Sequence, residues 1–327
     1  PTSALCLIAY EALATPATGG SGKGGDHQGS REVAGGPAAL TAALVSAAQS
    51  AGVTLRTGAE VTAIDVTEGA VTGVTLADGA TIAATTVVSA IGPRKTLLDL
   101  VDPLWLPPTE TGDAQNIRTR GTTAKVHLAI SGDLTFHGGP GGVERAWVGP
   151  HPLDLERAFD DARLREPVRA PVLDVRVPTV SDPSLAPAGH HVVSIWAHGA
   201  AFDLDVLPND GREQGVDSLN SGWGEAATAS LKAAVLAQLR RFCDLPDERI
   251  VGCEVLTPAD IADRYALEGA HPWHGEVGLD QLWTLRPTRT TSQHATPIAG
   301  LYLGSAGAHG GAALTCGAGA LAAKAVS

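Results

Sequence analysis

A group of glycines around one histidine near the end of the chain is the segment best suited to chemistry. Gly304, Gly307 and Gly311 surround His309 and lie between a short apolar segment and a final apolar run. Glycines between a buried strand and a helix let the backbone approach a ligand closely, and the first N–H groups of the helix favour negative charge. His309 is the candidate catalytic residue, as a proton donor or substrate contact, although a bond to nearby backbone explains it equally well.

Three further side chains are candidate substrate contacts. Lys125 and His127 alternate with apolar residues, so both point to the same face of a predicted strand, which could meet substrate or solvent. His274 is the third. His271 and His274 do not predict a metal site, because the proline between them interrupts a helix and no third ligand adjoins them.

A glycine-rich segment, Gly19 to Gly25, contains the Gly-Lys pair of phosphate-binding loops. Such a loop needs a glycine five residues before that pair and a Ser or Thr after it. Those positions hold Ala17 and Gly24, which excludes a P-loop.

The elements that position these residues follow from hydrophobic periodicity. A helix is predicted from Gly35 to Gly52, with one apolar face. β-rich segments separated by turn residues then predict a strand and a three-stranded meander. The last of them, around 86–91, has the composition of a strand buried on both faces. The helix face comprises Leu40, Ala43, Leu44, Ala47 and Ala48, and the β-rich segments are 53–56, 61–66, 71–76 and 81–90.

The middle of the chain predicts a second, mixed-sheet region. Its strands are expected at 123–130, 172–177 and 191–197, and a long helix at 226–243. A short buried strand at 300–304 and a helix at 317–326 then complete the order of elements.

The composition limits the function classes. The 327 residues are 44% hydrophobic and 18% charged, which is typical of a globular enzyme, and the net charge of −12 disfavours binding to nucleic acid or to anionic membranes. No integral membrane segment or signal peptide is predicted. The scattered cysteines predict free thiols and a cytoplasmic location. They are Cys6, Cys243, Cys253 and Cys316.

Three blocks in a consistent order resemble the phytoene-dehydrogenase-like FAD oxidoreductases, a family that includes carotenoid desaturases and pyridine-nucleotide-disulfide-oxidoreductase-domain proteins. The first block runs from Gly35-Gly36-Pro37 through Glu60-Val61 to Val87-Val88-Ser89-Ala90. The second is His274-Gly275-Glu276 through Arg286-Pro287, and the third is Gly300-Leu301-Tyr302-Leu303-Gly304 through Gly311. Only the C-terminal portion of the family pattern is matched.

The resemblance implies an FAD cofactor. In such a protein the backbone of Val61 would contact the adenine, and the turn after Gly304 would lie beneath the flavin with the following helix directed at the ring. The cofactor-binding residues implied in this way are Val61, Ala90, Gly304, Ser305, Gly310, Gly311, Ala312, Ala313 and Leu314.

The sequence departs from the family pattern in two places. Gly310 follows His309 where a proline is common, and Ala312-Ala313 replace a further glycine and its neighbour. The family also begins with a strand, a G-x-G-x-x-G turn and a helix that bind the pyrophosphate, and this sequence has no such unit. We therefore expect a partner chain to carry it, either as a separate gene product or as a segment that was removed.

The predicted fold is α/β, with an incomplete FAD-binding Rossmann-like layered domain and a mixed-sheet and helix substrate domain. The expected divisions are an N-terminal segment at 1–34, the FAD-binding part at 35–104 and 296–327, and a substrate-binding domain at 105–295.

The predicted function is that of one subunit of a split FAD-dependent oxidoreductase, a dehydrogenase or oxidase that removes a hydride from a small organic molecule. The alternative is a non-catalytic scaffold or partner subunit that kept the flavoprotein fold without binding the cofactor by itself. A membrane-associated carotenoid desaturase is disfavoured by the acidic charge and the lack of an exposed apolar helix.

Overall fold

The computed structural model describes residues 33–137, 142–149, 151–204, 222–311 and 316–327. The chain forms two compact units, described separately below. Unit 1 comprises Arg56–Gly121 and Arg264–Ser327, and unit 2 comprises Thr122–Asp263 together with the described residues before Arg56. The divisions thus lie near 121 and 263, whereas the sequence suggested 104 and 295.

Unit 1 contains an antiparallel meander and a pair of parallel strands. The meander has the order β1 (Val61–Thr67), β2 (Ala70–Leu76), β3 (Thr81–Ala83). Tight turns with Gly69 and Gly79 at positive φ join these strands. The parallel pair is β4 (Val87–Ser89) and β10 (Leu301–Leu303). The predicted strand at 81–90 is therefore two strands in different sheets.

Three helices complete unit 1: α3 (Pro93–Leu98), α4 (Pro108–Gln115) and α8 (Gly317–Val326). Each of the first two has a proline in its first turn, where the missing N–H costs no intrahelical bond. The buried core draws on the meander, α3 and β10, with Ile64, Leu97, Ile298, Leu301 and Leu303 among its members.

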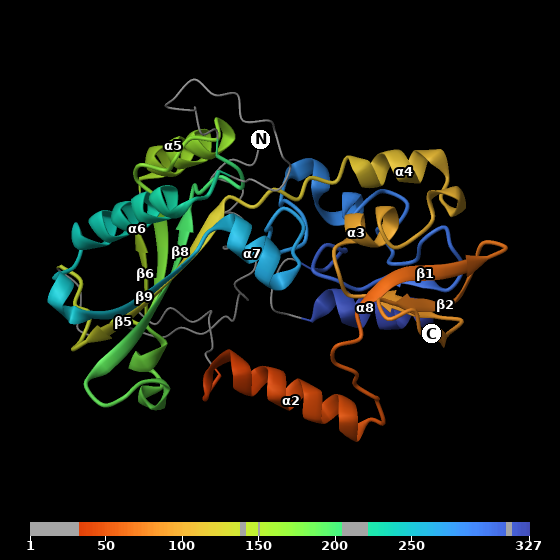
Figure 1. The fold of residues 1–327 in the computed structure, drawn as a ribbon, viewed down its shortest axis with the longest axis horizontal. Helices are drawn as coiled ribbons and strands as arrows, with labels where there is room; N and C mark the ends of the chain where they lie inside the picture. The colour runs from red at the N-terminus through yellow and green to blue at the C-terminus, as the bar shows by residue number, and fades with distance from the viewer. Residues whose placement is uncertain (1–32, 138–141, 150, 205–221, 312–315) are drawn as a thin grey trace, which may run out of the picture. The chain divides into compact units, whose positions relative to one another are not determined.

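Unit 2 is built on a five-stranded antiparallel sheet. The strands are β5 (Thr123–Ser131), β6 (Arg145–Val148), β7 (Val172–Arg176), β8 (His190–His198) and β9 (Ile250–Leu256), in the order β6-β7-β8-β5-β9. Helices α5 (Pro152–Arg163) and α6 (Glu225–Arg240) cover one face of it (Figure 1). The alternate residues Val126, Leu128, Leu173 and Ile195 point to that face and pack with α6. Three of the strands and α6 were predicted; β6, β9 and α5 were not.

Helix α7 (Pro258–Tyr265) spans the division between the units. Within the described part of the chain, no helix has the length and hydrophobicity needed to cross a membrane.

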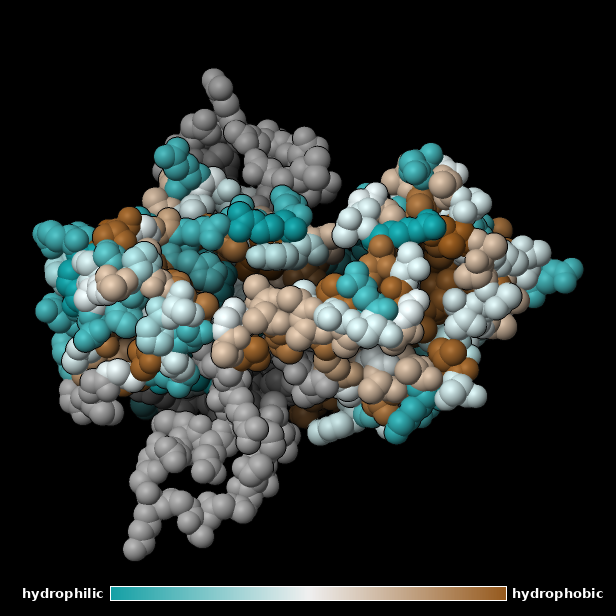
Figure 2. All heavy atoms as spheres, turned by 90° about the horizontal axis from the view of Figure 1, so that it is seen from below, coloured by the Kyte–Doolittle hydropathy of each residue, from teal (hydrophilic) through white to brown (hydrophobic). Residues whose placement is uncertain are grey.

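Helix α2 (Gly36–Ser50) has an apolar surface, and of its residues only Gly36 is buried. The N–H of Gly35 donates to the Asp182 carboxylate at 2.7 Å, and this bond holds the start of the helix to unit 2. Leu40 and Leu44 are nevertheless 39% and 51% exposed. Figure 2, which views the chain from the side on which α2 lies in Figure 1, shows hydrophobic residues at this surface. The predicted helix exists, but no described element covers its apolar face.

The segment after α2 also differs from its prediction. Residues 53–56 form no strand, and Val53 and Leu55 are exposed. Strand propensity alone does not order such a short segment without a neighbouring strand to bond to.

Candidate functional site

The two parallel strands of unit 1 bring their carboxyl ends to the same edge. The N–H of Val87 donates to Gly300 O at 2.8 Å, and the N–H of Gly304 donates to Ser89 O at 2.8 Å. Because bonding alternates along a parallel strand, the N–H and C=O of Val88 point away from β10. No other strand among the described residues pairs with that side of β4, and Val88 is 45% exposed. The expectation of a strand buried on both faces is not met in this chain.

The glycine turn after β10 is packed so closely that side chains do not fit. A Cβ at Gly304 would lie 3.0 Å from Val88 Cγ1, and a Cβ at Gly307 would lie 2.4 Å from Pro93 Cδ. At Gly311 it would lie 2.3 Å from the Ala306 carbonyl oxygen. The glycines are therefore required by the packing of the turn against β4, α3 and itself.

Backbone and side-chain bonds close this turn. The buried Ser305 hydroxyl accepts from the Gly307 N–H at 3.1 Å. Gly310 has a φ of +71°, which glycine adopts without strain. Ala312, Ala313 and Leu314, the remaining predicted cofactor residues of the turn, lie outside the described residues.

His309, the predicted catalytic residue, is partly buried and tied to backbone. Its Nδ1 lies 3.0 Å from the carbonyl oxygen of Trp283, so in this arrangement Nδ1 carries the proton. That bond fixes the ring in place and leaves Nε2 as the nitrogen able to exchange a proton.

The loop before β10 is organised by a buried arginine. The Arg286 guanidinium is 3% exposed and donates to backbone carbonyls along the loop and to Ala306 O, at 3.0 Å, in the glycine turn. The other acceptors are the carbonyls of Trp273, Gly275, Glu276 and Gln281. Arg286 thus fixes the loop to the turn.

The carboxylates of the same loop bind a second arginine. Arg118 pairs with Glu276 at 3.0 Å and with both oxygens of Asp280 at 2.7 and 2.9 Å. Glu276, Asp280 and Arg286 therefore hold this loop together through ion pairs and hydrogen bonds.

His274 lies beside the carboxyl end of β4. A Cβ at Gly92, three residues after β4, would be 4.0 Å from His274 Cβ, and a Cβ at Gly307 would be 2.9 Å from His274 O. Burial lowers the pKa of His274, and the positive charge of Arg286 lowers it further. A hydrogen bond to the backbone of Ile91 has the opposite effect and raises this pKa, but the net shift is downward. The ring is therefore neutral near pH 7. Its Nδ1 is buried with no hydrogen-bond partner among the described residues.

A second buried imidazole, which sequence reasoning missed, adjoins β10. His294 Nδ1 donates to Leu303 O at 2.7 Å, and its buried Nε2 has no partner in the described part of the chain. The neighbouring sequence, from Thr290 to Thr296, is mostly polar and gave no sign of burial. Buried polar atoms left without a bond cost free energy, so such atoms indicate a missing partner or ligand.

The other predicted cofactor residues are placed as follows. Val61 begins β1 opposite Leu76 and is partly exposed, and Ala90 is exposed directly after β4. Among these residues, the orphaned His274 Nδ1 fits a flavin, whose ring edge carries both donors and acceptors, whereas Gly304, Gly307 and Gly311 are explained by packing within the protein. No group of ligands for a metal ion exists among the described residues.

Unit 2 contributes a separate set of polar residues. The register of its sheet places Trp147, Asp174, Trp196, Lys125 and Leu256 in one row across all five strands. The next row on the same face is Arg145, Arg176, Ser194, His127 and Glu254. These two rows, which point away from the core shared with α6, are the polar face. The predicted candidates Lys125 and His127 lie next to each other on it.

One buried carboxylate organises the cations of the polar face. Asp174 is 5% exposed and accepts from the Arg145 guanidinium at 2.9 and 3.0 Å. The Arg176 guanidinium lies 3.6 Å from the same carboxylate. The fork geometry makes this a charge-assisted bidentate pair.

Lys125 is held by an aromatic ring. Its Nζ lies 4.3 Å from the centroid of the Trp196 ring. Burial lowers the pKa of Lys125 to about 8. The negative charge of Asp174 opposes this shift, and the positive charge of Arg176 adds to it. Burial likewise lowers the pKa of His127, so the imidazole is neutral at pH 7.

His198 forms the end of the polar face. Its ring stacks on that of Trp147 with centroids 5.6 Å apart, and burial lowers its pKa to about 4. Its Nε2 is buried without a hydrogen-bond partner among the described residues. The sequence indicated Lys125 and His127 of β5. Arg145, Trp147, Trp196 and His198 were missed, and for the last two the alternation along 190–198 was the available signal.

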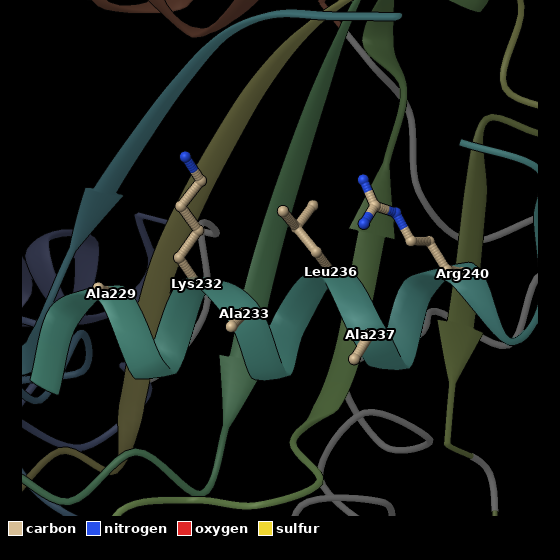
Figure 3. Close-up of a pocket in the computed structure, with 6 residues that line it drawn as sticks. All are labelled: Ala229, Lys232, Ala233, Leu236, Ala237 and Arg240. Carbon is tan, nitrogen blue, oxygen red and sulfur yellow. The ribbon is translucent and has the colours of Figure 1, made fainter. Parts of the chain in front are cut away.

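A shallow groove of about 300 Å³ lies elsewhere in unit 2, along one side of α6 (Figure 3). Its lining residues follow the helix at one-turn spacing and include Lys232 and Arg240. None of the predicted site residues lines it.

Comparison with known proteins gives a consistent assignment. Residues 11–237 match the family model described as flavin containing amine oxidoreductase. Pyridine nucleotide-disulfide oxidoreductase domain-containing protein 2 from Mus musculus is 29% identical over 90% of this chain and 50% of its own length. The Rattus norvegicus protein of the same name is 29% identical over 85% of this chain and 48% of its own length. The chain thus spans about half the length of the curated relatives it matches.

Solved structures share the fold. An oxidoreductase from Methanosarcina mazei superposes with a TM-score of 0.51 at 18% identity, covering 90% of this chain and 54% of that one. A triple mutant of putrescine oxidase gives a TM-score of 0.52 at 14% identity, covering 89% and 52%. The mixed α/β fold is confirmed, and the flavin in the family's description confirms the predicted FAD cofactor. The chain belongs to the flavin containing amine oxidoreductase family.

Proposed function

We propose that this chain is one subunit of a split FAD-dependent oxidoreductase that removes a hydride from a small organic molecule. The observation that carries the proposal is the parallel pair β4–β10, which ends in a close-packed glycine turn and has an open edge at Val88. Parallel sheets of two strands rarely stand alone, since their strands are normally covered on both faces and paired on both sides.

The partner we propose is a chain with a strand, a G-x-G-x-x-G turn and a helix, whose strand pairs with β4. The backbone N–H and C=O of Val88 would bond to that strand. They supply the unpaired backbone groups that an incoming strand needs. The curated relatives, at about twice this length, have room for such a unit in one chain.

When bound, FAD supplies the hydride acceptor. The chain's own residues then have separable tasks. The turn from Gly304 to Gly311 and Val61 hold the cofactor, and neutral His274 offers Nδ1 to its edge. His309 Nε2, in unit 1, is the nitrogen that would exchange a proton with a substrate or a water. Lys125 and His127, in unit 2, are kept as candidate substrate contacts of the polar face.

Within this family we favour a phytoene-dehydrogenase-like subgroup, because the three matching blocks occur in the order of that pattern. A cytoplasmic location is part of the proposal. Of the three described cysteines, none forms a disulfide.

Co-expression with a candidate partner carrying G-x-G-x-x-G tests the proposal. The purified complex should be yellow, with a flavin absorbance spectrum and FAD released on denaturation. A colourless complex would leave the non-catalytic scaffold as the better explanation, and a monodisperse yellow protein obtained from this chain alone would contradict the need for a partner.

A matched pair of substitutions tests the docking edge. Val88→Pro removes the outward N–H from an edge strand, where proline is tolerated, and Val88→Thr keeps it. We expect the proline variant to lose co-purification of the partner and the threonine variant to retain it. Equal retention by both would mean that the partner does not pair with β4.

A further inference from the structure

Lys125 lies in the middle of the polar face of unit 2. Its strand, β5, pairs with β8 on one side and with β9 on the other, and helices α5 and α6 lie on the opposite face of the sheet (Figure 1). Lys125 is partly exposed. Its side chain is therefore partly removed from water, yet a small molecule can still reach it.

The amine of Lys125 contacts an aromatic ring instead of a carboxylate. Nζ lies 4.3 Å from the centroid of the Trp196 ring, and the two residues are directly opposite in the β5–β8 pair. Lys125 takes part in none of the ion pairs between described residues, and the carboxylate of Asp174 accepts hydrogen bonds from Arg145. An indole recovers only part of the hydration free energy that a buried ammonium loses. The charged form of this amine is therefore weakly stabilised.

These surroundings favour the neutral amine. Burial is the main cause that lowers the pKa of Lys125 to about 8, and the positive charge of Arg176 acts in the same direction against the negative charge of Asp174. Removal from water beside a second cation is one way in which proteins turn a lysine into a nucleophile. At neutral pH the uncharged fraction of such an amine is about two orders of magnitude larger than that of a fully solvated lysine.

A neutral imidazole adjoins this amine. His127 lies two residues further along the same face of β5. Burial lowers its pKa, and the charge of Lys125 lowers it further, so the two groups are near each other. A neutral imidazole both accepts and donates a proton near pH 7. Lys125 and His127 thus supply a nucleophile and a group that moves protons, which is what addition to a carbonyl group requires.

We propose that the polar face binds aldehydes covalently, as an imine on Lys125 Nζ. The lone pair of Nζ forms a bond to the carbonyl carbon, and His127 moves protons from the nitrogen to the oxygen. The oxygen leaves as water with both amine protons, and a C=N bond replaces the C=O bond. This condensation needs no oxidant or reductant, so the site does not depend on the flavin of the proposed function.

Reductive trapping tests the site. The full chain, without added FAD, is treated with benzaldehyde and sodium cyanoborohydride near neutral pH, and the benzylated lysines are located by peptide mass spectrometry. Lys125 should be modified about tenfold or more faster than the exposed Lys232 of α6, because the neutral amine is the reacting form. In concentrated guanidinium chloride, where the fold is lost, the two lysines should react alike.

Two substitutions separate the nucleophile from the proton-moving group. Lys125→Arg keeps the positive charge but forms no imine, so the fast phase of benzylation should disappear from the intact mass. With the reductant in excess, His127→Gln should slow trapping on Lys125 about tenfold or more. Modification of Lys232 is the internal control in both variants, and thermal unfolding shows that unit 2 stays folded.

The outcomes distinguish this proposal from the preceding one. Equal modification of Lys125 and Lys232 in the folded chain would overturn the imine site whatever the flavin content, and an unchanged rate in His127→Gln would overturn the role of the imidazole. Fast modification of Lys125 in a chain that never acquires FAD, even with a partner, would uphold the site and contradict the flavoenzyme.

Discussion

The two sheets with functional residues differ in how far they complete themselves. In unit 2, five strands pair in one antiparallel sheet, and α5 and α6 cover one of its faces. Because side chains alternate along each strand, the residues of the two polar rows point to the opposite face. In unit 1, two parallel strands end at a glycine turn, and one side of β4 has no neighbour among the described residues. The sheet of unit 2 is thus complete among the described residues, whereas β4 in unit 1 has a free edge there, which under the proposed function the partner chain would cover.

The largest expected effect comes from a substitution in the core of the five-stranded sheet of unit 2. Leu128 is 1% exposed in the core between β5 and α6, so Leu128→Ala should cost about 2–5 kcal/mol of the free energy of unfolding of unit 2. Hydrogen exchange followed by mass spectrometry should show faster exchange in Thr122–Asp263 and little change in unit 1. Equal acceleration in both units would show that they unfold as one.

A smaller effect tests the packing of the glycine turn in unit 1. Gly307→Ala places a Cβ against the rigid Pro93 ring and should destabilise by about 1–3 kcal/mol. Gly112→Ala in α4 meets nothing within 4 Å and should be neutral or stabilising by about 0.5–1 kcal/mol. Chemical denaturation measures both. A neutral Gly307→Ala would mean that the turn relaxes freely without its cofactor.

The smallest effect concerns a buried carboxyl in unit 1. Glu110 in α4 accepts hydrogen bonds from Thr288 and Thr290, yet burial raises its pKa above the ordinary 4.5. Because the folded state holds this proton more tightly, the stabilisation is present at low pH and is lost as the pH rises through the raised pKa.

Glu110→Gln should remove this part of the pH dependence. The unfolding temperature of the parent protein should fall more than that of the variant as the pH rises above the ordinary pKa of 4.5. Identical slopes would show that the carboxyl is solvated. Asp113, which also raises the pKa of Glu110, provides a second variant, Asp113→Asn, expected to shift the fall to lower pH.

Local signals in the sequence predicted much of the fold. The helices at 36–50 and 317–326 have glycine at the boundaries where the structure shows them to begin or end, and long alternating strands such as 123–131 are visible from period two. β6 and β9 were missed because each strand depends on pairing with a distant segment of the chain. Residues 53–56 were mistaken for a strand because strand propensity does not show whether a neighbouring strand is available for pairing.

The candidate site could be proposed from the sequence where its residues lie in one segment, but not where the sheet brings distant residues together. The glycines from 304 to 311 were identified from one segment. The row of Trp147, Asp174, Trp196 and Lys125 draws one residue from each of four strands, and only the register brings these residues side by side. His274 was identified as a candidate, but its unpartnered Nδ1 depends on folding of the loop around Arg286.

The alternation of the five-stranded sheet has an evolutionary consequence. Every residue on the polar face is flanked in sequence by residues that point to the opposite side of the sheet. A single substitution at Lys125 or Trp196 can therefore change the chemistry of the polar face without replacing a side chain of the core. In such a sheet, residues of the polar face can change during evolution, one strand after another, while the residues of the core and the stability they provide are kept.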